Sequence, residues 1–460
     1  MTAADRELIE LRIGAIAHGG HCVARHGGRV VFVRHTLPGE LVRARLTDAA
    51  EGASYWRADA VEVIEPSADR VPHAWAQADA LHRKLPVGGA EFGHISRAGQ
   101  RRLKADVLAE QLRRLAGLDP DSPFLDTDVE DVDAAGQPGQ AAGFGWRTRA
   151  GFSVTAAGKL GMHAHRSATV LAVTRMPLAA DAINDLHLAE ADLTGIVRVE
   201  VAAPANGSRP LVLLAPDPAL DAKAAGRAVK RAAAGLPADA SVAGWDPESG
   251  AVDAVRGRSW VQESASGHEF RVTGDGFWQI HRRAPEVLTG AVLGYLADGH
   301  LPAGVAVADL YAGAGLFTAA LADAVGPAGV VLSVEGSPGA SRDARKNLHA
   351  AGQVRIASGR VEKVLGGELR AGHRFGTLVL DPPRAGAGKA VVAQLADSGA
   401  RAIAYVSCDP ASFARDLGYF RRRGWDLAQL RAFDLYPHTH HLETVALLLP
   451  NAVGHPPNAG

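Results

Sequence analysis

Helical and strand patterns alternate along the C-terminal part of the chain, from about Arg282 onward. A helical stretch over Ala284 to Leu296 leads into an apolar run that ends at Asp309. Further apolar runs cover residues 330–334, 377–380 and 403–406. Alternation of this kind is typical of a parallel sheet whose strands are joined by helices. The pattern therefore predicts an α/β domain over residues 281–460.

The N-terminal region instead shows short alternating runs separated by glycine turns. Residues Val42 to Leu46 alternate apolar side chains with Arg43 and Arg45, and an apolar run follows the turn at Gly27-Gly28. About five such strands predict a small barrel of the oligonucleotide-binding kind over residues 1–68. Arg43 and Arg45 would share its outer face, where they either face solvent or contact an RNA backbone.

Residues 69–280 combine one basic helix with β-rich material. The helix has an apolar side with Leu108, Leu112 and Leu115 and a basic side with Arg101, Arg102, Lys104, Arg113 and Arg114. An acidic stretch rich in Ala and Gly, Asp119 to Gly143, indicates a loop. In the segment GWRTRAGF, Arg147 and Arg149 lie on the same side of an extended strand. We predict a central α+β domain whose basic residues either face solvent or contact RNA.

Composition and charge exclude several classes of protein. No apolar run is long enough to span a bilayer, and MTAADRELIE lacks the pattern of a signal peptide, so we expect a cytoplasmic protein. The wide spacing of the two cysteines, Cys22 and Cys408, argues against a disulfide scaffold. With a formal net charge of -1, any RNA contact must come from local basic patches. We expect a monomer by default.

Cys408 lies within the stretch YVSCDPASFARDL, Tyr405 to Leu417. An apolar strand precedes the cysteine, and Pro410 ends that strand before a helix begins. The thiol would therefore lie near a helix N-terminus, where backbone N–H groups stabilise a thiolate and lower its pKa. The alternative is a small buried apolar side chain, the usual state of a lone cysteine.

A glycine turn, DLYAGAGLFT at Asp309 to Thr318, follows the first strand of the C-terminal domain. Gly313 and Gly315 allow the backbone to approach a ligand closely. The next strand ends at Glu335, which either accepts hydrogen bonds from a ribose diol or is an ordinary exposed glutamate. Enzymes that bind NAD share this turn, but their pyrophosphate requires a third glycine where this helix opens with Leu316-Phe317. S-adenosylmethionine (SAM), which has no phosphate, is the better ligand.

Eight ordered motifs resemble those of the SAM-dependent RNA uridine-5-carbon methyltransferases, which include enzymes acting on tRNA and on 23S rRNA. The first is AHGGHCVARHGGRVVFVRHTLPGE, at Ala17 to Glu40, which resembles the small RNA-binding barrel called a TRAM domain. The others are GWRTRAGF, GFWQIH, DLYAGAGLF, VEGSPGASRDARKNL, LDPPRAG, YVSCDPASFARDL and FDLYPHTHHLETVALL. The resemblance covers nearly the whole chain. It implies a class I (Rossmann-like) SAM methyltransferase domain after a TRAM barrel and a β-rich central domain.

The resemblance also implies roles for particular residues. Gln279, Tyr311, Glu335 and Asp381 would line the SAM site together with the turn of Gly313 and Gly315. Cys408 would be the nucleophile and Glu443 the general base. The chemistry requires both, because a thiolate must add to C6 of uracil before C5 can accept a methyl group, and a base must then remove the C5 proton. Partial burial of Glu443 would raise its pKa towards a useful value.

The RNA substrate must expose one base to the cysteine. We therefore expect the target uridine to be flipped out of its stack, while the barrel, Arg147 and Arg149 hold the RNA backbone.

The chain departs from the family at two places. Many relatives bind an iron–sulfur cluster through four cysteines in a pattern that contains CGGC, whereas here Val87 and Ala90 stand in VGGAEFGHIS. We therefore expect no cluster. Leu316 replaces an asparagine that usually contacts SAM. The spacing of His438, His440 and His441 could suggest a metal site, but no suitable partner set accompanies them, so we expect none.

Three other functions compete with this interpretation. A 5-methylcytidine methyltransferase would typically carry a proline-cysteine turn where this chain has Asp381-Pro382-Pro383. A non-catalytic RNA-binding or ribosome-assembly factor would not need Cys408 and Glu443. An NAD-dependent oxidoreductase would need the third glycine. The phrase FDLYPHTHHLE favours 23S rRNA slightly over tRNA as the substrate.

Overall fold

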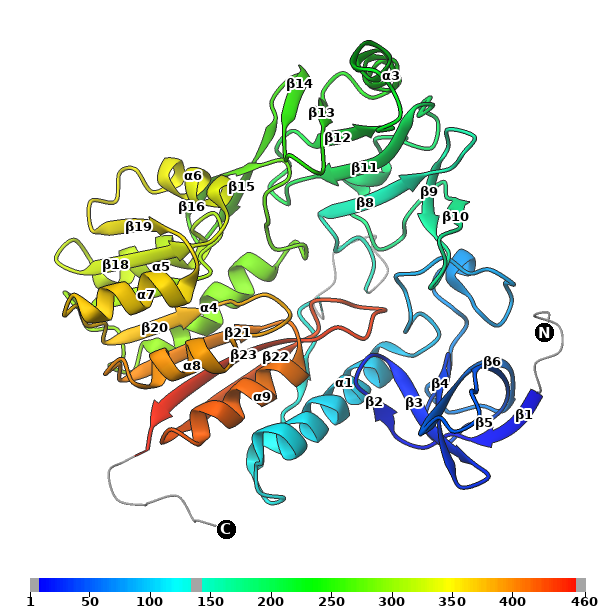
Figure 1. The fold of residues 1–460 in the computed structure, drawn as a ribbon, viewed down its shortest axis with the longest axis horizontal. Coiled ribbons are helices and arrows are strands. Elements are labelled where there is room, and N and C mark those ends of the chain that lie inside the picture. Colours follow the sequence, from blue (N-terminus) through cyan, green and yellow to red (C-terminus); the bar gives the residue numbers. More distant parts are fainter. Residues whose placement is uncertain (1–7, 134–142, 452–460) are drawn as a thin grey trace.

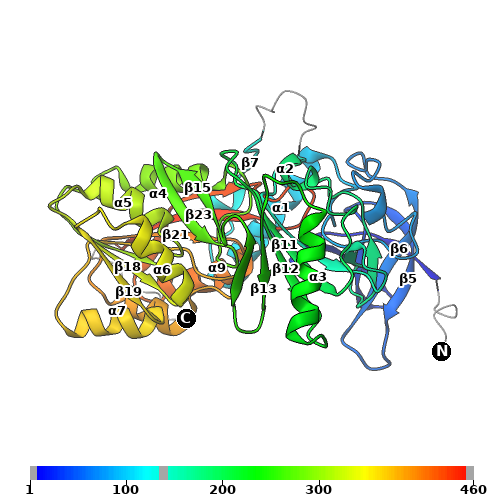
Figure 2. The ribbon, with the colours of Figure 1, turned by 90° about the horizontal axis from the view of Figure 1, so that it is seen from above.

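The computed structural model describes residues 8–133 and 143–451, and the chain forms three regions (Figure 1). The barrel and the C-terminal sheet lie at opposite ends of the view from above (Figure 2), and Figure 1 shows the central domain to one side of both, with α1 (Arg97–Gln111) next to the barrel and to α9 (Pro410–Arg421). Among the described residues, no helix combines the length and the apolar character needed to cross a membrane.

The N-terminal region is a mixed six-stranded barrel, with strands in the order β1-β5-β6-β4-β3-β2. Its strands are β1 (Leu8–Arg12), β2 (Ile16–Ala17), β3 (His21–His26), β4 (Arg29–Arg34), β5 (Leu41–Asp48) and β6 (Tyr55–Glu65). Along β5, Val42, Ala44 and Leu46 are buried while Arg43 and Arg45 point outward, as the alternation predicts. The barrel thus has one strand more than expected, the two-residue β2.

The basic helix is α1 (Arg97–Gln111), and it connects the barrel with the C-terminal domain. Ser96 caps it by accepting a hydrogen bond from the N–H of Gly99, and a turn of π-helix, η2 (Leu112–Ala116), extends it. Because a π turn adds a residue per turn, the apolar side shifts phase: Leu112 and Ala116 are buried, and Leu115 is 43% exposed. The prediction that Leu115 belongs to the apolar side is therefore wrong.

Much of the basic side of α1 is engaged in ion pairs. Lys104 is buried and donates to Asp434 Oδ1 at 2.6 Å, and Arg101 pairs with Asp131 at 2.7 Å. Along the chain, the short element η1 (Ala76–Ala78) precedes this helix, and η3 (Pro123–Asp126) and β7 (Val129–Glu130) follow it. Lys104 and Arg101 therefore connect the helix to neighbouring segments, whereas contact of the exposed Arg113 and Arg114 with RNA stays a prediction.

The central domain contains a seven-stranded sheet of order β10-β9-β8-β11-β12-β13-β14 and a separate hairpin, β15-β16. Its elements are β8 (Arg149–Val154), β9 (Leu160–His163), β10 (Val170–Ala172), α2 (Asp181–Asn184), β11 (Ile196–Ala202), β12 (Leu211–Pro216), α3 (Ala222–Ala234), β13 (Ser241–Trp245), β14 (Val252–Arg256), β15 (Trp260–Ala265) and β16 (His268–Thr273). Val87 and Ala90, each 3% exposed, pack into the apolar core of this domain.

An eight-stranded sheet of order β19-β18-β17-β20-β21-β23-β22-β7 organises the C-terminal domain. Its helices and strands are α4 (Ala284–Leu296), β17 (Ala306–Leu310), α5 (Leu316–Val325), β18 (Val330–Glu335), α6 (Pro338–Asn347), β19 (Val354–Ser358), α7 (Val361–Arg370), β20 (Thr377–Leu380), α8 (Gly388–Ala396), β21 (Ala402–Ser407), α9 (Pro410–Arg421), β22 (Trp425–Phe433) and β23 (Glu443–Pro450). One face packs on α4 and α5, and the other packs on α7, α8, α9 and the end of α1.

The predicted parallel α/β sheet is confirmed for five neighbouring strands, β19, β18, β17, β20 and β21. The terminal strand β23 runs antiparallel to β21, and β7 adds a parallel edge strand next to β22. Residues 97–130, which the sequence groups with the central domain, thus pack on the C-terminal sheet. Parallel strands place their carboxyl ends at one edge, where ligands of open α/β sheets bind.

Candidate active site

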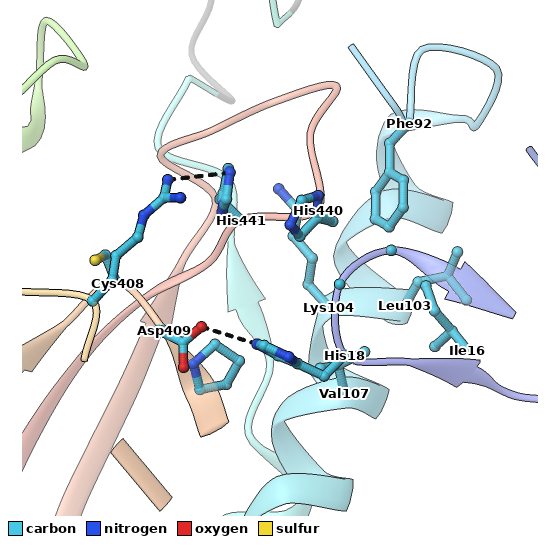
Figure 3. Close-up of a pocket in the computed structure, with 14 residues that line it drawn as sticks. Ile16, His18, Phe92, Leu103, Lys104, Val107, Cys408, Asp409, His440 and His441 are labelled. Carbon is cyan, nitrogen blue, oxygen red and sulfur yellow. Dashed lines mark hydrogen bonds and ion pairs between the residues drawn. The ribbon is translucent and has the colours of Figure 1, made fainter. Parts of the chain in front are cut away.

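Cys408 lies between β21 and α9, facing a cavity at the junction of the three regions (Figure 3). Asp409 is the N-cap of α9 and accepts a hydrogen bond from the N–H of Ser412 at 2.8 Å. The loop after β2 and helix α1 form the opposite wall of this interdomain cavity. Its lining includes Ile16, His18, Gly20, Phe92, Leu103, Lys104, Arg384, Cys408, His440 and His441.

The thiol of Cys408 is less acidic than the sequence predicts. Burial and the nearby carboxyl groups of Glu443 and Asp381 raise the pKa of Cys408 to about 12, although Arg384 opposes them. The prediction of a lowered pKa is therefore wrong, because burial of the thiol raises its pKa and two carboxyl groups, Glu443 and Asp381, add to that effect.

Glu443 is the first residue of β23 and is 2% exposed. Its Oε2 accepts a hydrogen bond from the hydroxyl of Tyr436 at 2.8 Å. Burial and the neighbouring Asp381 raise the pKa of Glu443 to about 8, while the Tyr436 hydrogen bond acts in the opposite direction. The predicted upward shift is confirmed, with complete rather than partial burial as its cause.

Four of the six predicted SAM residues line one pocket beside the carboxyl ends of β17 and β20. These are Gln279, Tyr311, Gly313 and Asp381, and they share the pocket with Phe277, Trp278, Leu316 and Phe317. Gln279 Nε2 donates to Asp381 Oδ2 at 3.2 Å. Burial and the charge of Asp309 raise the pKa of Asp381 to about 7.

The turn around this pocket has an unusual backbone. Tyr311, Gly313 and Gly315 have φ values of 64°, 57° and 100°, all in the region that favours glycine. A Cβ at Gly313 would meet no atom within 4 Å, so open space adjoins the backbone there, whereas a Cβ at Gly315 would lie 2.8 Å from Leu348 Cδ1. Gly313 therefore leaves room for a ligand, and Gly315 allows close packing against α6 and the loop that follows it.

Glu335 lies at the end of β18, as expected, but its carboxylate is hydrogen-bonded to the glycine turn before α5. It accepts hydrogen bonds from the N–H of Gly313 at 2.8 Å and from the N–H of Ser337 at 2.6 Å. Contact between Glu335 and a ribose stays a prediction.

The pocket fits SAM by its chemistry. Aromatic side chains, a carboxyl group and an amide suit an adenosine with a sulfonium centre, while Leu316 and Phe317 occupy the helix start where a pyrophosphate would bind.

The predicted RNA-binding arginines differ in their surroundings. Arg45 is exposed, whereas Arg43 forms ion pairs with Glu62 and, at 3.4 Å, with Glu10. Arg147 Nε donates to the carbonyl of Arg149 at 2.8 Å, and Arg149 Nη1 donates to the carbonyl of Gly276 at 2.7 Å. Arg149 therefore stabilises a contact within the central domain, which favours a structural role over direct contact with phosphates.

Of the three C-terminal histidines, His440 and His441 line the interdomain cavity and His438 does not. His438 is buried and hydrogen-bonded to Gln100, His441 Nε2 lies 3.3 Å from Arg384 Nη2, and the rings of His440 and His441 are 4.2 Å apart. Within residues 8–133 and 143–451, no group of three or more His, Cys, Asp or Glu side chains could hold a metal ion.

Two contacts at this site were not predicted from the sequence. Tyr436 reaches Glu443, and His18, from the loop of the barrel, lies 2.9 Å from Asp409 beside the cysteine (Figure 3). The hydrogen bond to Asp409 raises the pKa of His18. His18 and Asp409 lie 391 positions apart, and a single sequence carries no signal for a contact between residues at that separation.

Comparison with known proteins places this geometry in context. The family model described as tRNA (Uracil-5-)-methyltransferase matches residues 302–451, and the TRAM domain model matches residues 5–61. An uncharacterized RNA methyltransferase of Streptomyces avermitilis is 44% identical over 452 residues, covering 97% of this chain and 99% of that protein. A 23S rRNA (uracil(1939)-C(5))-methyltransferase of Acinetobacter baumannii is 27% identical and covers 95% of this chain and 94% of that protein.

A solved structure shares the fold over almost the whole length. It is a tRNA (uracil-54, C5)-methyltransferase of Pyrococcus abyssi in complex with S-adenosyl-L-homocysteine, 18% identical, with a TM-score of 0.65. The match covers 95% of this chain and 99% of that chain.

Proposed function

Because the chain belongs to the SAM-dependent RNA (uracil-5-)-methyltransferases that carry a TRAM domain, we propose that it methylates C5 of one uridine in a structured RNA, with Cys408 as nucleophile and Glu443 as base. A 23S rRNA is favoured over tRNA, supported by the motif FDLYPHTHHLE and by the similarity to a relative named for 23S rRNA.

One observation carries this proposal: Cys408 and the two carboxyl groups of Glu443 and Asp381 converge between two cavities. Cys408 lines the interdomain cavity, and Asp381 lines the pocket proposed for SAM. The charges of Glu443 and Asp381 both act on the Cys408 thiol. A uracil entering from the interdomain cavity would therefore meet the nucleophile, the base and the methyl donor at one point.

The proposed reaction begins and ends at Cys408. As its proton leaves, Sγ forms a bond to C6 of uracil, and the electron pair of the C5–C6 double bond moves towards C5 and the O4 carbonyl. C5 then accepts the methyl group that SAM, held by residues such as Gln279, Tyr311 and Asp381, would supply; the electrons of the broken S–CH3 bond stay on sulfur, and S-adenosylhomocysteine leaves. Glu443 then takes the proton from C5, the C5–C6 double bond re-forms, and the C–S bond breaks with its electrons returning to sulfur.

The high pKa of Cys408 has a consequence for this sequence of events. A thiol with a pKa of about 12 is largely protonated at neutral pH, so the free enzyme contains little of the reactive thiolate. The proton has an acceptor nearby in Asp381, with a pKa of about 7, so the Glu443 carboxylate remains available for the C5 proton. Substrate binding would have to favour the thiolate for addition to begin.

The test is nucleoside mass spectrometry on unmodified total RNA after incubation with SAM and purified protein. Wild type should produce 5-methyluridine, and Cys408→Ala should not. Cys22→Ala is the matched control, because Cys22 is buried in the barrel core and should retain activity. Appearance of 5-methylcytidine would overturn the assignment of the base. SAM binding without any methylated nucleoside would favour a non-catalytic RNA-binding factor.

A further inference from the structure

A second cavity lies in the central domain, next to the pocket proposed for SAM. The central-domain cavity is lined by residues of β8, β11, β12 and β13 and by the segment 274–280, including Arg149, Arg198, Glu200, Trp245, Phe277 and Trp278. Phe277 and Trp278 also line the SAM pocket, so one short segment separates the two spaces. Neither the proposed catalytic residues nor the proposed SAM contacts explain the central-domain cavity.

Aromatic side chains give this cavity an exposed apolar surface. Phe277 is 65% exposed, which is the largest exposure among the large apolar side chains in the described part of the chain. Trp245, at the end of β13, is half-buried, and the guanidinium of Arg198 lies 5.5 Å from the centroid of its ring. Aromatic rings and a stacked guanidinium plane are the surfaces on which unstacked RNA bases bind.

Hydrogen-bond donors at the cavity lack partners. Nε of Arg149 and Nε1 of Trp245 are buried and have no hydrogen-bond partner within the described residues, and Nη2 of Arg149 has only the ion-pair contact with Glu263 Oε1 at 3.8 Å. Buried donors are normally satisfied, because leaving one unpaired destabilises the fold. Because these atoms have almost no accessible surface, a nucleobase in the cavity would pair with them only if the side chains of Arg149 or Trp245 moved.

The charges at the cavity favour a base over a phosphate. Arg198 Nε donates to Glu200 Oε1 at 2.7 Å, and Arg149 lies 3.8 Å from Glu263, so each guanidinium has a carboxyl neighbour. Asp275, another lining residue, adds a further acidic group. This balance gives a phosphate little attraction but is compatible with a neutral heterocycle.

Arg147 links the central-domain cavity to the reaction centre. Its guanidinium is within electrostatic reach of Glu200, at the cavity, and of Arg384 and Tyr436, at the catalytic cavity. Arg384 lines the interdomain cavity together with Cys408. An RNA strand that passes Arg384 and Arg147 would therefore bring a nucleotide near the target uridine to the central-domain cavity.

We propose that the central-domain cavity binds a second, unmethylated base of the RNA substrate, flipped out of its stack and held against Trp245 and Phe277. This inference rests on the proposed function, since it takes the substrate to be RNA. The site would add to substrate selection, because only an RNA able to extrude two bases at the required spacing could fill both cavities.

The first test uses Trp245→Ala and Arg198→Ala, since neither residue lines the SAM pocket. With the RNA that wild type methylates, KM for RNA should rise about tenfold for Trp245→Ala, with kcat changed less than twofold and the affinity for S-adenosylhomocysteine unchanged. Trp245→Phe should recover most of the loss, because a ring remains. Arg422→Ala is the matched control, since this arginine also lies over an aromatic ring, that of Tyr419 on α9, away from the cavity.

The second test removes the base instead of the side chain. Abasic nucleotides are placed one at a time at positions near the target uridine. In wild type, one such position should raise KM about tenfold, and Trp245→Ala should show no further increase at that position. Unchanged KM in both variants would overturn the proposal, and a parallel loss of S-adenosylhomocysteine affinity would assign the cavity to the methyl donor.

Failure of the two proposals can be told apart. If wild type transfers no methyl group, the proposed function fails, yet binding of a single-stranded oligouridylate by Cys408→Ala can still be measured by fluorescence anisotropy. In that background, Trp245→Ala should weaken binding if the cavity holds a base, and equal affinity would refute the cavity assignment.

Discussion

Removal of the hydroxyl of Tyr436 should change the protonation of the proposed base. Tyr436 donates a hydrogen bond of 2.8 Å to Glu443 Oε2 and thereby favours the charged carboxylate. Tyr436→Phe keeps the ring, which packs 6.0 Å from Trp146 and 5.9 Å from His441, so the fold should survive. Without the donor, the pKa of Glu443 should rise further above its present value of about 8.

The size of the effect follows from the hydrogen bond. A hydrogen bond to a charged group contributes roughly 1.5–3 kcal/mol, equivalent to about one to two pH units. For a shift of about one unit from a pKa of about 8, the ionised fraction of Glu443 at pH 7.5 falls from about a quarter to about 3%. If proton removal limits turnover, kcat at pH 7.5 should fall about eightfold.

The assay is the pH profile of kcat with saturating RNA and SAM. The acid limb should move from near pH 8 in wild type to near pH 9 in Tyr436→Phe, with equal rates at higher pH. RNA deuterated at C5 of uridine shows whether proton removal limits the rate. Tyr419→Phe, a change on the outer part of α9, should leave the profile unaltered. A limb that stays in place, or a loss that is the same at every pH, would refute the argument that Tyr436 tunes Glu443.

Three further predictions concern the base, the domain junction and the glycine turn. Glu443→Gln should accumulate a covalent Cys408–RNA complex on denaturing gels. Folding raises the pKa of Glu443 to about 8, so the contribution of this group to stability is present at low pH and is lost as pH rises through about 8. The melting temperature of Glu443→Gln should therefore exceed that of wild type by more at about pH 8.5 than at about pH 6. His18→Ala should raise KM for RNA a few-fold at pH 6 and hardly at pH 9. The exposed pair of His18 and Asp409 contributes at most about 1 kcal/mol, and only while the histidine is protonated. Equal effects on KM at both pH values would contradict this prediction. Gly315→Ala should destabilise the fold by about 1–3 kcal/mol in thermal melts. Gly290→Ala, at an exposed and open position of α4, should stabilise the fold slightly. A Gly315→Ala variant more stable than Gly290→Ala would refute the argument that the backbone at Gly315 is strained for alanine.

Local pattern accounts for the features that the sequence predicts correctly. The turn at Cys408, the glycine turn before α5 and the alternating face of β5 each depend on a few consecutive residues, and the structure has all three. The position of Glu443 at the start of a buried strand is likewise a local property, and its raised pKa follows from that burial.

Features that depend on distant residues could not be predicted in this way. The pKa of Cys408 depends on its burial and on Glu443 and Asp381, and no periodicity shows that these carboxyl groups lie near the thiol. The pairs His18–Asp409 and Lys104–Asp434 join different domains. The exposure of Leu115 follows from a π turn, and β7 has only two residues, too few for a recognisable alternation.

Trapping of the covalent intermediate tests the central claim most directly. RNA containing 5-fluorouridine at the target position carries no C5 proton for Glu443 to remove, so the adduct should persist after methyl transfer. Digestion and mass spectrometry should find a methylated fluorouridine nucleotide attached to the peptide that contains Cys408. The absence of any adduct from an enzyme that methylates normal RNA, or an adduct on Cys22 instead, would contradict the assignment of Cys408 as the nucleophile.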